Sequence, residues 1–344
     1  MSIELSFSRE NEAVDGLIQE LFDRVGGVYH PALVREMVIS ALKAGQETSY
    51  LADMKMLNNT MKEMRYTNKV FAPYRNKKKV TIFGSARTTA EEPIYQLCVE
   101  FSRRLAEKGY MIITGGGPGI MQAGNEGAGS ENSFAVNIFL PFEQSPNIVM
   151  ANTPRLITYK YFFNRKVAFV KESDAIAVFP GGFGTLDEAM EVFTLIQTGK
   201  TDPKPLILID DETGYWEGWL EFIKMKILGK GFISADDFSI FTITRDVDEA
   251  IQVVEDFYTN YHSHRFVGGK LIIRLTKDLS DQQLEELAVE FPEMLLPGTV
   301  IRRTPPLPEE ADEPDTLHLH RIIIDFDHHH YGLLIAFIRQ LNMF

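Results

Sequence analysis

The spacing of apolar residues along the chain changes near residue 79. Before that point apolar residues recur at helical spacing. In the segment that begins at Pro31, Leu33, Met37, Val38 and Leu42 lie on one helical face, and the pattern stops at a glycine. The stretch YLADMKMLNNTMKEM continues the pattern. We therefore predict a helical N-terminal extension over residues 1–78.

From Lys79 onward, short β-branched runs alternate with helical segments. The runs are VTIFG, YMIITGGG, FAVNIFL, DAIAVFP, PLILI and FSIFTI, and each is followed by a helical pattern. Strands that are apolar throughout indicate a parallel sheet with helices on both faces. Residues 79–261 are thus predicted to form a doubly wound, Rossmann-like α/β domain of six βα units. Such domains bind ligands beyond the carboxyl ends of their strands.

Residues 262–344 have a third pattern, which predicts a small α+β module. The segments GKLIIRLT, GTVIRR and LHLHRIIIDF are expected to be strands, and SDQQLEELAVEF and YGLLIAFIRQLNMF helices. Between them, TPPLPEEADEPD contains four prolines and five acids without a basic residue. This composition predicts a solvated loop.

Composition narrows the function classes. The net charge of −13 argues against a surface for non-specific binding of nucleic acid or anionic lipid, so an anionic ligand requires a local pocket. The single cysteine, Cys98, lies in a helical pattern and is expected to be a buried, inert thiol. The N-terminus lacks the pattern of a signal peptide, and no apolar run is long enough for a membrane helix. These features predict a soluble cytoplasmic protein.

Two glycine-containing turns follow the first two predicted strands. In FGSAR, Gly84 and Ser85 allow backbone amides to approach a ligand, although a plain turn is an equal alternative. In TGGGPGIMQAGNEGA, a strand leads through glycines into a helix, a geometry that attracts phosphate. These glycines are Gly115, Gly116, Gly117 and Gly119. Gln122 stands where the dinucleotide fingerprint requires its last glycine, and the lysine of a Walker loop is absent.

A third turn, PGGFGTLDE, follows the predicted strand DAIAVFP. Gly181, Gly182 and Gly184 form the loop, and Thr185 is predicted to begin a helix. The Thr185 hydroxyl and the surrounding backbone amides are predicted to hold phosphate oxygens. Thr185 and Glu188 also match a capping box, which leaves open whether Glu188 is a helix cap or a reactive group.

Other candidate groups have simpler interpretations. Arg165 and Lys166 lie in an aromatic helical segment, where a surface pair is the usual interpretation. Gly199-Lys200-Thr201 resembles the end of a Walker loop, but it lies in a helical context and lacks the upstream glycine. In DFDHHHYG, adjacent histidines rarely converge on one ion, so a turn is favoured and no metal is assigned.

Together these segments resemble the LOG family, also labelled "possible lysine decarboxylase". The resemblance rests on Gly115–Met121, the Arg165-Lys166 pair and Pro180–Glu188, and it spans about residues 80–260. It implies hydrolysis of a nucleoside 5′-monophosphate to a free base and ribose 5-phosphate, without a cofactor. It also implies a homo-oligomer, with a homodimer as the smallest expected assembly.

The same resemblance implies roles for individual residues. Arg165 and Glu188 correspond to the catalytic pair, and Met121 and Lys166 belong to the matching binding motifs. The chain has Phe162-Phe163-Asn164 where the small enzymes of the family have Met-His-Glu, so the preferred base is left open.

Two other functions remain as alternatives. A non-catalytic nucleotide or molybdenum-cofactor carrier has similar glycine turns, but it does not need the carboxylate of Glu188. A decarboxylase would require pyridoxal phosphate on a lysine, and no lysine lies in a recognisable cofactor motif.

Overall fold

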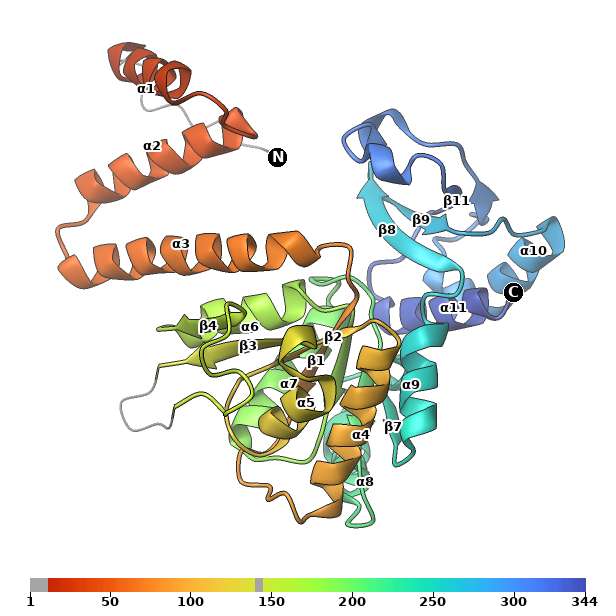
Figure 1. Ribbon diagram of the computed structural model, residues 1–344. Coiled ribbons are helices and arrows are strands. Elements are labelled where there is room, and N and C mark those ends of the chain that lie inside the picture. The colour runs from red at the N-terminus through yellow and green to blue at the C-terminus, as the bar shows by residue number, and fades with distance from the viewer. Residues whose placement is uncertain (1–11, 140–144) are drawn as a thin grey trace. The chain divides into compact units, whose positions relative to one another are not determined.

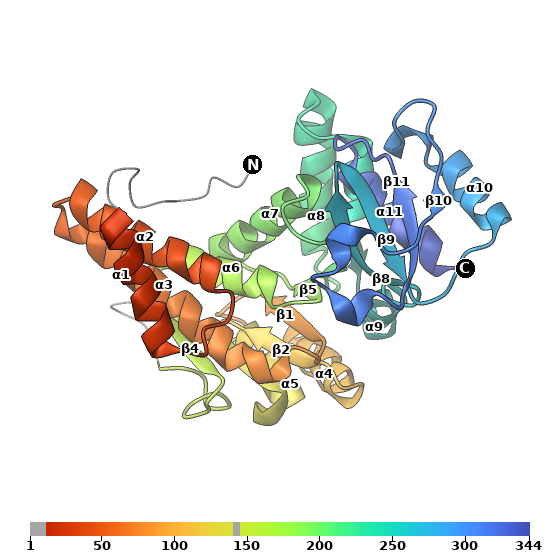
Figure 2. The same cartoon turned by 90° about the horizontal axis from the view of Figure 1, so that it is seen from above.

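The computed structural model describes residues 12–139 and 145–344 (Figures 1 and 2). Contacts divide the chain into two compact units, Met1–Tyr66 and Thr67–Phe344, and each is described here by itself. The predicted three-part division, with boundaries near residues 78 and 261, stays a prediction.

The N-terminal unit contains three helices, and the second and third lie at the positions that helical spacing predicts. They are α1 (Glu12–Val25), α2 (Pro31–Glu47) and α3 (Leu51–Phe71), whose last residues belong to the second unit. The helix α2 begins at Pro31, because proline lacks the amide hydrogen that a first helical turn leaves unbonded.

The second unit is built on a seven-stranded parallel sheet of order β4-β3-β2-β1-β5-β6-β7. The strands are β1 (Lys79–Phe83), β2 (Met111–Thr114), β3 (Ser133–Ile138), β4 (Leu156–Tyr159), β5 (Ala175–Val178), β6 (Leu206–Ile209) and β7 (Thr242–Thr244). Every neighbouring pair is parallel. The strand order reverses between β1 and β5, which is where doubly wound folds bind ligands. The predicted Rossmann-like fold class is confirmed.

Helices cover both faces of the sheet because its central strands are apolar on both sides. Alternate residues of β5 and β6 enter two separate hydrophobic clusters. One cluster contains α4 (Pro93–Glu107), α5 (Ile120–Ala128) and α9 (Val247–Asp256), and the other contains α6 (Phe162–Lys171), α7 (Phe183–Gln197) and α8 (Tyr215–Phe222). Figure 1 shows α4, α5 and α9 on one side of the strands.

Two features of the sheet differ from the sequence-based expectation. The edge strand β4 was not predicted, because its residues alternate between buried and more exposed positions instead of forming an apolar run. The last predicted strand is shorter than expected, since Ala235–Ile240 forms a 3₁₀ helix before β7.

The C-terminal segment forms an antiparallel sheet of order β10-β11-β9-β8. Its elements are β8 (Tyr261–Val267), β9 (Lys270–Leu275), α10 (Asp281–Glu290), β10 (Arg302–Arg303), β11 (His320–Ile324) and α11 (Tyr331–Asn342). The predicted strands and helices of this α+β module are present, and β8 is an additional strand. Its sequence, YHSHRFV, lacks an apolar run. Residues of α11 share one hydrophobic cluster with α6 and α7.

Short helical turns connect these elements. They are the 3₁₀ helices Ala72–Tyr74, Ser130–Asn132, Leu228–Lys230, Pro292–Met294, Pro308–Glu310 and Pro314–Thr316, and the π-helical turn Ile223–Ile227.

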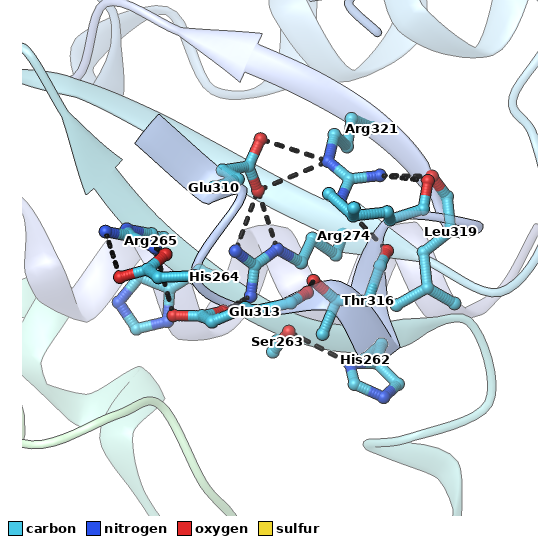
Figure 3. Close-up of polar contacts among 12 residues, drawn as sticks. His262, Ser263, His264, Arg265, Arg274, Glu310, Glu313, Thr316, Leu319 and Arg321 are labelled. Carbon is cyan, nitrogen blue, oxygen red and sulfur yellow. Dashed lines mark hydrogen bonds and ion pairs between the residues drawn. The ribbon is translucent and has the colours of Figure 1, made fainter. Parts of the chain in front are cut away.

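The acidic, proline-rich loop is not fully solvated, which corrects the prediction from composition. Glu310 is completely buried and accepts hydrogen bonds from Arg274 Nη2 (2.7 Å) and Arg321 Nε (3.1 Å) (Figure 3). Glu313 pairs with Arg274 and with Arg265. The basic partners of these acids lie on β8, β9 and β11, so the composition of the loop alone does not reveal them.

Three further observations concern the chemistry of the described residues. Cys98 is buried, as predicted, and burial raises the pKa of its thiol. No helix in residues 12–139 and 145–344 is long and apolar enough to cross a membrane. Over the same residues no group of three or more His, Cys, Asp or Glu side chains is arranged to hold a metal ion.

Candidate functional site

The three predicted turns meet at the carboxyl ends of β1, β2 and β5. These strands are adjacent in the sheet, with β1 in the centre. The Ser85 amide donates to the Pro180 carbonyl (3.0 Å), and the Ile120 amide donates to the Ser85 carbonyl (2.9 Å). The turn after β1 is therefore bonded to both of its neighbours, at the point where the strand order reverses.

Close contact between these turns explains two of the glycines. A Cβ atom on Gly119, whose φ is +67°, would overlap the Ser85 carbonyl oxygen. A Cβ atom on Gly181 would overlap Thr185 Oγ1 and lie 2.9 Å from the Ser85 amide nitrogen. In contrast, the Cβ positions of Gly182 and Gly184 have nothing within 4 Å. Gly119 and Gly181 thus allow the turns to pack together, while Gly182 and Gly184 border open space.

Not every amide in the turns is available to a ligand. The Gly116 amide donates to Thr114 Oγ1 (3.0 Å), and the Ser85 amide is bonded to Pro180 as described above. At α7, Gly182 is the N-cap residue and no side chain caps the helix. The first amides of a helix have no partner within that helix, so the start of α7 is the part of the site best suited to an anion.

The structure corrects the predicted start of this helix. The helix α7 begins at Phe183, so Thr185 lies third in the helix and not at its beginning. Thr185 is buried, and its hydroxyl lies against Gly181. Glu188 is one turn further on, so the two residues cannot form the capping box that their spacing allowed. Capping therefore does not explain Glu188.

Glu188 on α7 instead forms a largely buried ion pair with Arg165 on α6. Arg165 Nη2 lies 2.7 Å from Glu188 Oε1, and the exposed fractions of the two side chains are 12% and 13%. Burial raises the pKa of Glu188 to about 7, although Arg165 and Lys166 oppose this shift. A carboxyl group with this pKa can accept or release a proton near neutral pH.

Arg165 is held by aromatic rings and lies beside the turn after β2. Its Cζ atom is 5.0 Å from the centre of the Phe162 ring and 5.5 Å from that of Phe169. A Cβ atom on Gly115 would lie 3.9 Å from Arg165 Nη1. Within the described part of the chain, Arg165 Nε is buried and has no hydrogen-bond partner.

Two other predicted residues have identifiable contacts. The Met121 side chain packs over Gly115 and Gly117, since Cβ atoms on these glycines would meet it first. Lys166 Nζ lies 2.9 Å from Asp187 Oδ2 and 2.7 Å from Glu191 Oε2. The predicted binding roles of Met121 and Lys166 stay predictions.

Sequence reasoning missed the side chains that fix the turns. Asn125 Oδ1 accepts hydrogen bonds from Thr114 Oγ1 (2.8 Å) and Asn147 Nδ2 (3.0 Å), and Asn147 Nδ2 also donates to the Gly117 carbonyl (3.0 Å). The Tyr215 hydroxyl donates to the Gly181 carbonyl (2.7 Å). Asn125, in the helix after the glycine turn, was the one residue that the sequence could have suggested as a support for the turn. Asn147 and Tyr215 come from distant segments, so the sequence gives no sign of their contacts with the turns.

The fold and the site define a Rossmann-like α/β protein with glycine turns and a buried Arg–Glu pair at the strand ends. Residues 121–254 match the family described as "Possible lysine decarboxylase". The chain is 25% identical over 186 residues to a probable cytokinin riboside 5′-monophosphate phosphoribohydrolase of Oryza sativa subsp. japonica, covering 54% of this chain and 86% of the relative. It is 24% identical to such an enzyme of Arabidopsis thaliana, covering 52% and 84%.

The chain is similar to the LOG family over about half of its length, and it is longer than the relatives that match it. Among solved structures, the molybdenum cofactor binding protein of Rippkaea orientalis aligns over 52% of this chain and 96% of its own length. That alignment has 20% identity and a TM-score of 0.38.

Proposed function

We propose that this protein hydrolyses the N-glycosidic bond of a nucleoside 5′-monophosphate and releases a free base and ribose 5-phosphate. The observation that carries the proposal is the buried pair of Arg165 and Glu188 beside the three glycine turns, with a Glu188 pKa of about 7. The named activity of the plant relatives, which is phosphoribohydrolysis of cytokinin riboside monophosphates, supports it.

Glu188 suits the chemistry of glycosidic cleavage. As the bond between C1′ and the base nitrogen breaks, its electron pair goes to the base and positive charge develops on the ribose ring. A water molecule forms the new bond to C1′, and the Glu188 carboxylate accepts its proton. With a pKa of about 7, Glu188 can then return a proton to the departing base. Arg165 holds the Glu188 side chain in place.

In this proposal the phosphate and the carboxylate contact different parts of one ligand. The first amides of α7 bind the 5′-phosphate next to Gly182 and Gly184, whose Cβ positions are unobstructed. Glu188 lies within the same helix, farther from its start, and faces the ribose. This arrangement allows an anion-binding turn and an acid to share one site.

Aromatic side chains supply an apolar surface for the base. Phe162 and Phe163 are each 48% exposed, so core packing does not account for them fully. Phe183, within the PGGFGT turn, is 93% exposed. Stacking on such rings tolerates any base, because every base has a π face. We therefore propose no preference between purine and pyrimidine nucleotides.

The test is an assay of base release from AMP, GMP, CMP, UMP and isopentenyladenosine monophosphate, each beside its nucleoside. Chromatography should detect equal amounts of base and ribose 5-phosphate from at least one nucleotide. The matching nucleoside should react far more slowly, because each lost charge-assisted hydrogen bond to phosphate costs roughly 1.5–3 kcal/mol. Equal cleavage of AMP and adenosine would contradict phosphate recognition, and binding without release from any nucleotide would favour a carrier.

A further inference from the structure

A cavity that does not include Arg165 or Glu188 is lined in part by their neighbours Lys166 and Glu191. It has a volume of about 550 Å³, within the range of roughly 300–1,000 Å³ that is typical of small-molecule sites. Its walls come from α6, the later part of α7, residues 199–204 and β8. The C-terminal module thus contributes one wall, through β8.

The cavity is rich in positive charge although the whole chain carries a net charge of −13. Its lining contains two acidic side chains, Glu191 and Asp202, and five cationic ones, which are Lys166, Lys171, Lys200, Lys204 and Arg265. Acidic neighbours already pair with Lys166, Lys171 and Arg265. Lys200 and Lys204 make no ion pair with any residue in the described ranges.

Lys204 is the more unusual of these two lysines, because its side chain is buried. Only 5% of Lys204 is exposed, and its ammonium group donates to the carbonyls of Val170 (2.7 Å) and Ser173 (2.7 Å). Burial lowers the pKa of Lys204 to about 8. An ammonium group has three donors, so one is left after the two carbonyls are satisfied. Asp202, Asp174 and Glu172 stabilise this buried cation from a distance, but none of them forms an ion pair with it, and an anion in the cavity would add a direct partner.

The C-terminal module contacts the residue that precedes Lys200. Lys200 follows Gly199, whose φ is +63°, and a Cβ atom on Gly199 would overlap the ring of Tyr331 at the start of α11. The Gly199-Lys200-Thr201 sequence is therefore not a Walker loop, because it follows a helix and does not precede one. Its lysine nevertheless lines the cavity together with Lys204.

Apart from Thr201 and His264, most of the remaining lining is apolar. Leu195, Val167 and Val170 come from the two helices, and Phe266 comes from β8. Phe266 is not fully buried. A ligand that fits both parts of the lining has a negatively charged group for the lysines and a flat apolar body for these side chains.

We propose that this cavity binds a small organic phosphate with a flat apolar body and that the bound ligand slows the reaction at the Arg165–Glu188 pair. The second part rests on the proposed function. Lys166 and Glu191 line the cavity, and each is close in sequence to one member of the catalytic pair. An anion here competes with Asp187 and Glu191 for Lys166, which adds negative charge beside Glu188.

Binding is tested without substrate, by calorimetric titration of the full chain with 1-naphthyl phosphate. Lys200→Ala should weaken binding at least tenfold, since a charge-assisted contact to phosphate is lost, and Lys200→Arg should restore most of it. Lys230→Ala, at an exposed lysine outside the cavity, is the matched control and should bind normally. Glu188→Gln should also bind normally, which separates this cavity from the catalytic site.

Two comparison probes test the two halves of the ligand. Inorganic phosphate and 1-naphthol should each bind at least tenfold more weakly than 1-naphthyl phosphate. No detectable binding of 1-naphthyl phosphate, equal binding by Lys200→Ala, or 1-naphthol binding as tightly as its phosphate ester would overturn the cavity assignment.

Regulation is tested separately, with an active nucleotide substrate. The probe should lower kcat without competing with the substrate, and Lys200→Ala should lose this inhibition while keeping its basal rate. Competitive inhibition, or no inhibition at a concentration that saturates the cavity, would refute the coupling. The titration remains informative even if no nucleotide is cleaved, so failure of the proposed function is distinguishable from failure of the cavity.

Discussion

Replacing Glu188 by glutamine separates its chemical role from any structural one. Glutamine keeps the size of the side chain and an oxygen that can accept from Arg165 Nη2, now 2.7 Å from Glu188 Oε1. The hydrogen bond from the charged Arg165 then has a neutral acceptor, which should cost about 1 kcal/mol of folding stability because the pair is partly exposed. The loss of a proton acceptor should lower base release by roughly 100-fold or more. A large loss of turnover with a small loss of stability is the expected result.

The pH dependence provides a second measure of the same residue. Because burial raises the pKa of Glu188 to about 7, the carboxyl is mostly protonated below that pH and mostly ionised above it. If the carboxylate accepts the proton of water, kcat/KM should rise with pH, pass its midpoint near pH 7 and then level off. The residual activity of Glu188→Gln should lack this inflection.

The assay measures base release from the best nucleotide across pH 5–9, with urea denaturation of each variant. Asp187→Asn is the matched control, because it also removes one negative charge from α7 but at a residue that pairs with Lys166 and is 62% exposed. It should retain most of the activity. Turnover of Glu188→Gln close to that of the wild type, or an unchanged inflection near pH 7, would refute the catalytic assignment.

Three further predictions follow from the fold and the site. Gly182→Ala should fold normally because its Cβ position is unobstructed, but the KM for the nucleotide should rise about tenfold or more. Gly181→Ala should instead distort the turn, because its Cβ atom would overlap Thr185. Equal kinetics in the two variants would contradict this distinction. Glu310→Gln should lower the free energy of unfolding by roughly 3–5 kcal/mol, because Arg274 and Arg321 lose a buried counter-charge. Urea denaturation measures this change, and a loss below about 1 kcal/mol would contradict the prediction. Light scattering of the full chain should give at least a dimer, as the family resemblance implies, and a monomer at assay concentration would contradict that expectation.

The sequence by itself determined the α/β class, the positions of most strands and the three turns of the candidate site. These features are local. A strand buried on both faces must be apolar at every position, as the central strands β5 and β6 are, and a tight turn at a strand end requires glycine. Gly119 is an example, since its φ of +67° is a backbone conformation that other residues rarely adopt. Such constraints act on neighbouring residues and are therefore visible in the sequence.

Only the tertiary structure decided what the charged residues do, because each depends on partners that the fold brings from elsewhere. Glu188 matches a helix cap in sequence, yet its partner is Arg165 on another helix, and burial of that pair shifts its pKa. Glu310 belongs to a run with the composition of a solvated loop, but two arginines from separate strands surround it. Lys204 is likewise buried by the packing of distant segments. Burial and charge pairing are properties of the assembled fold, since the cost of burying a charge depends on every group that surrounds it.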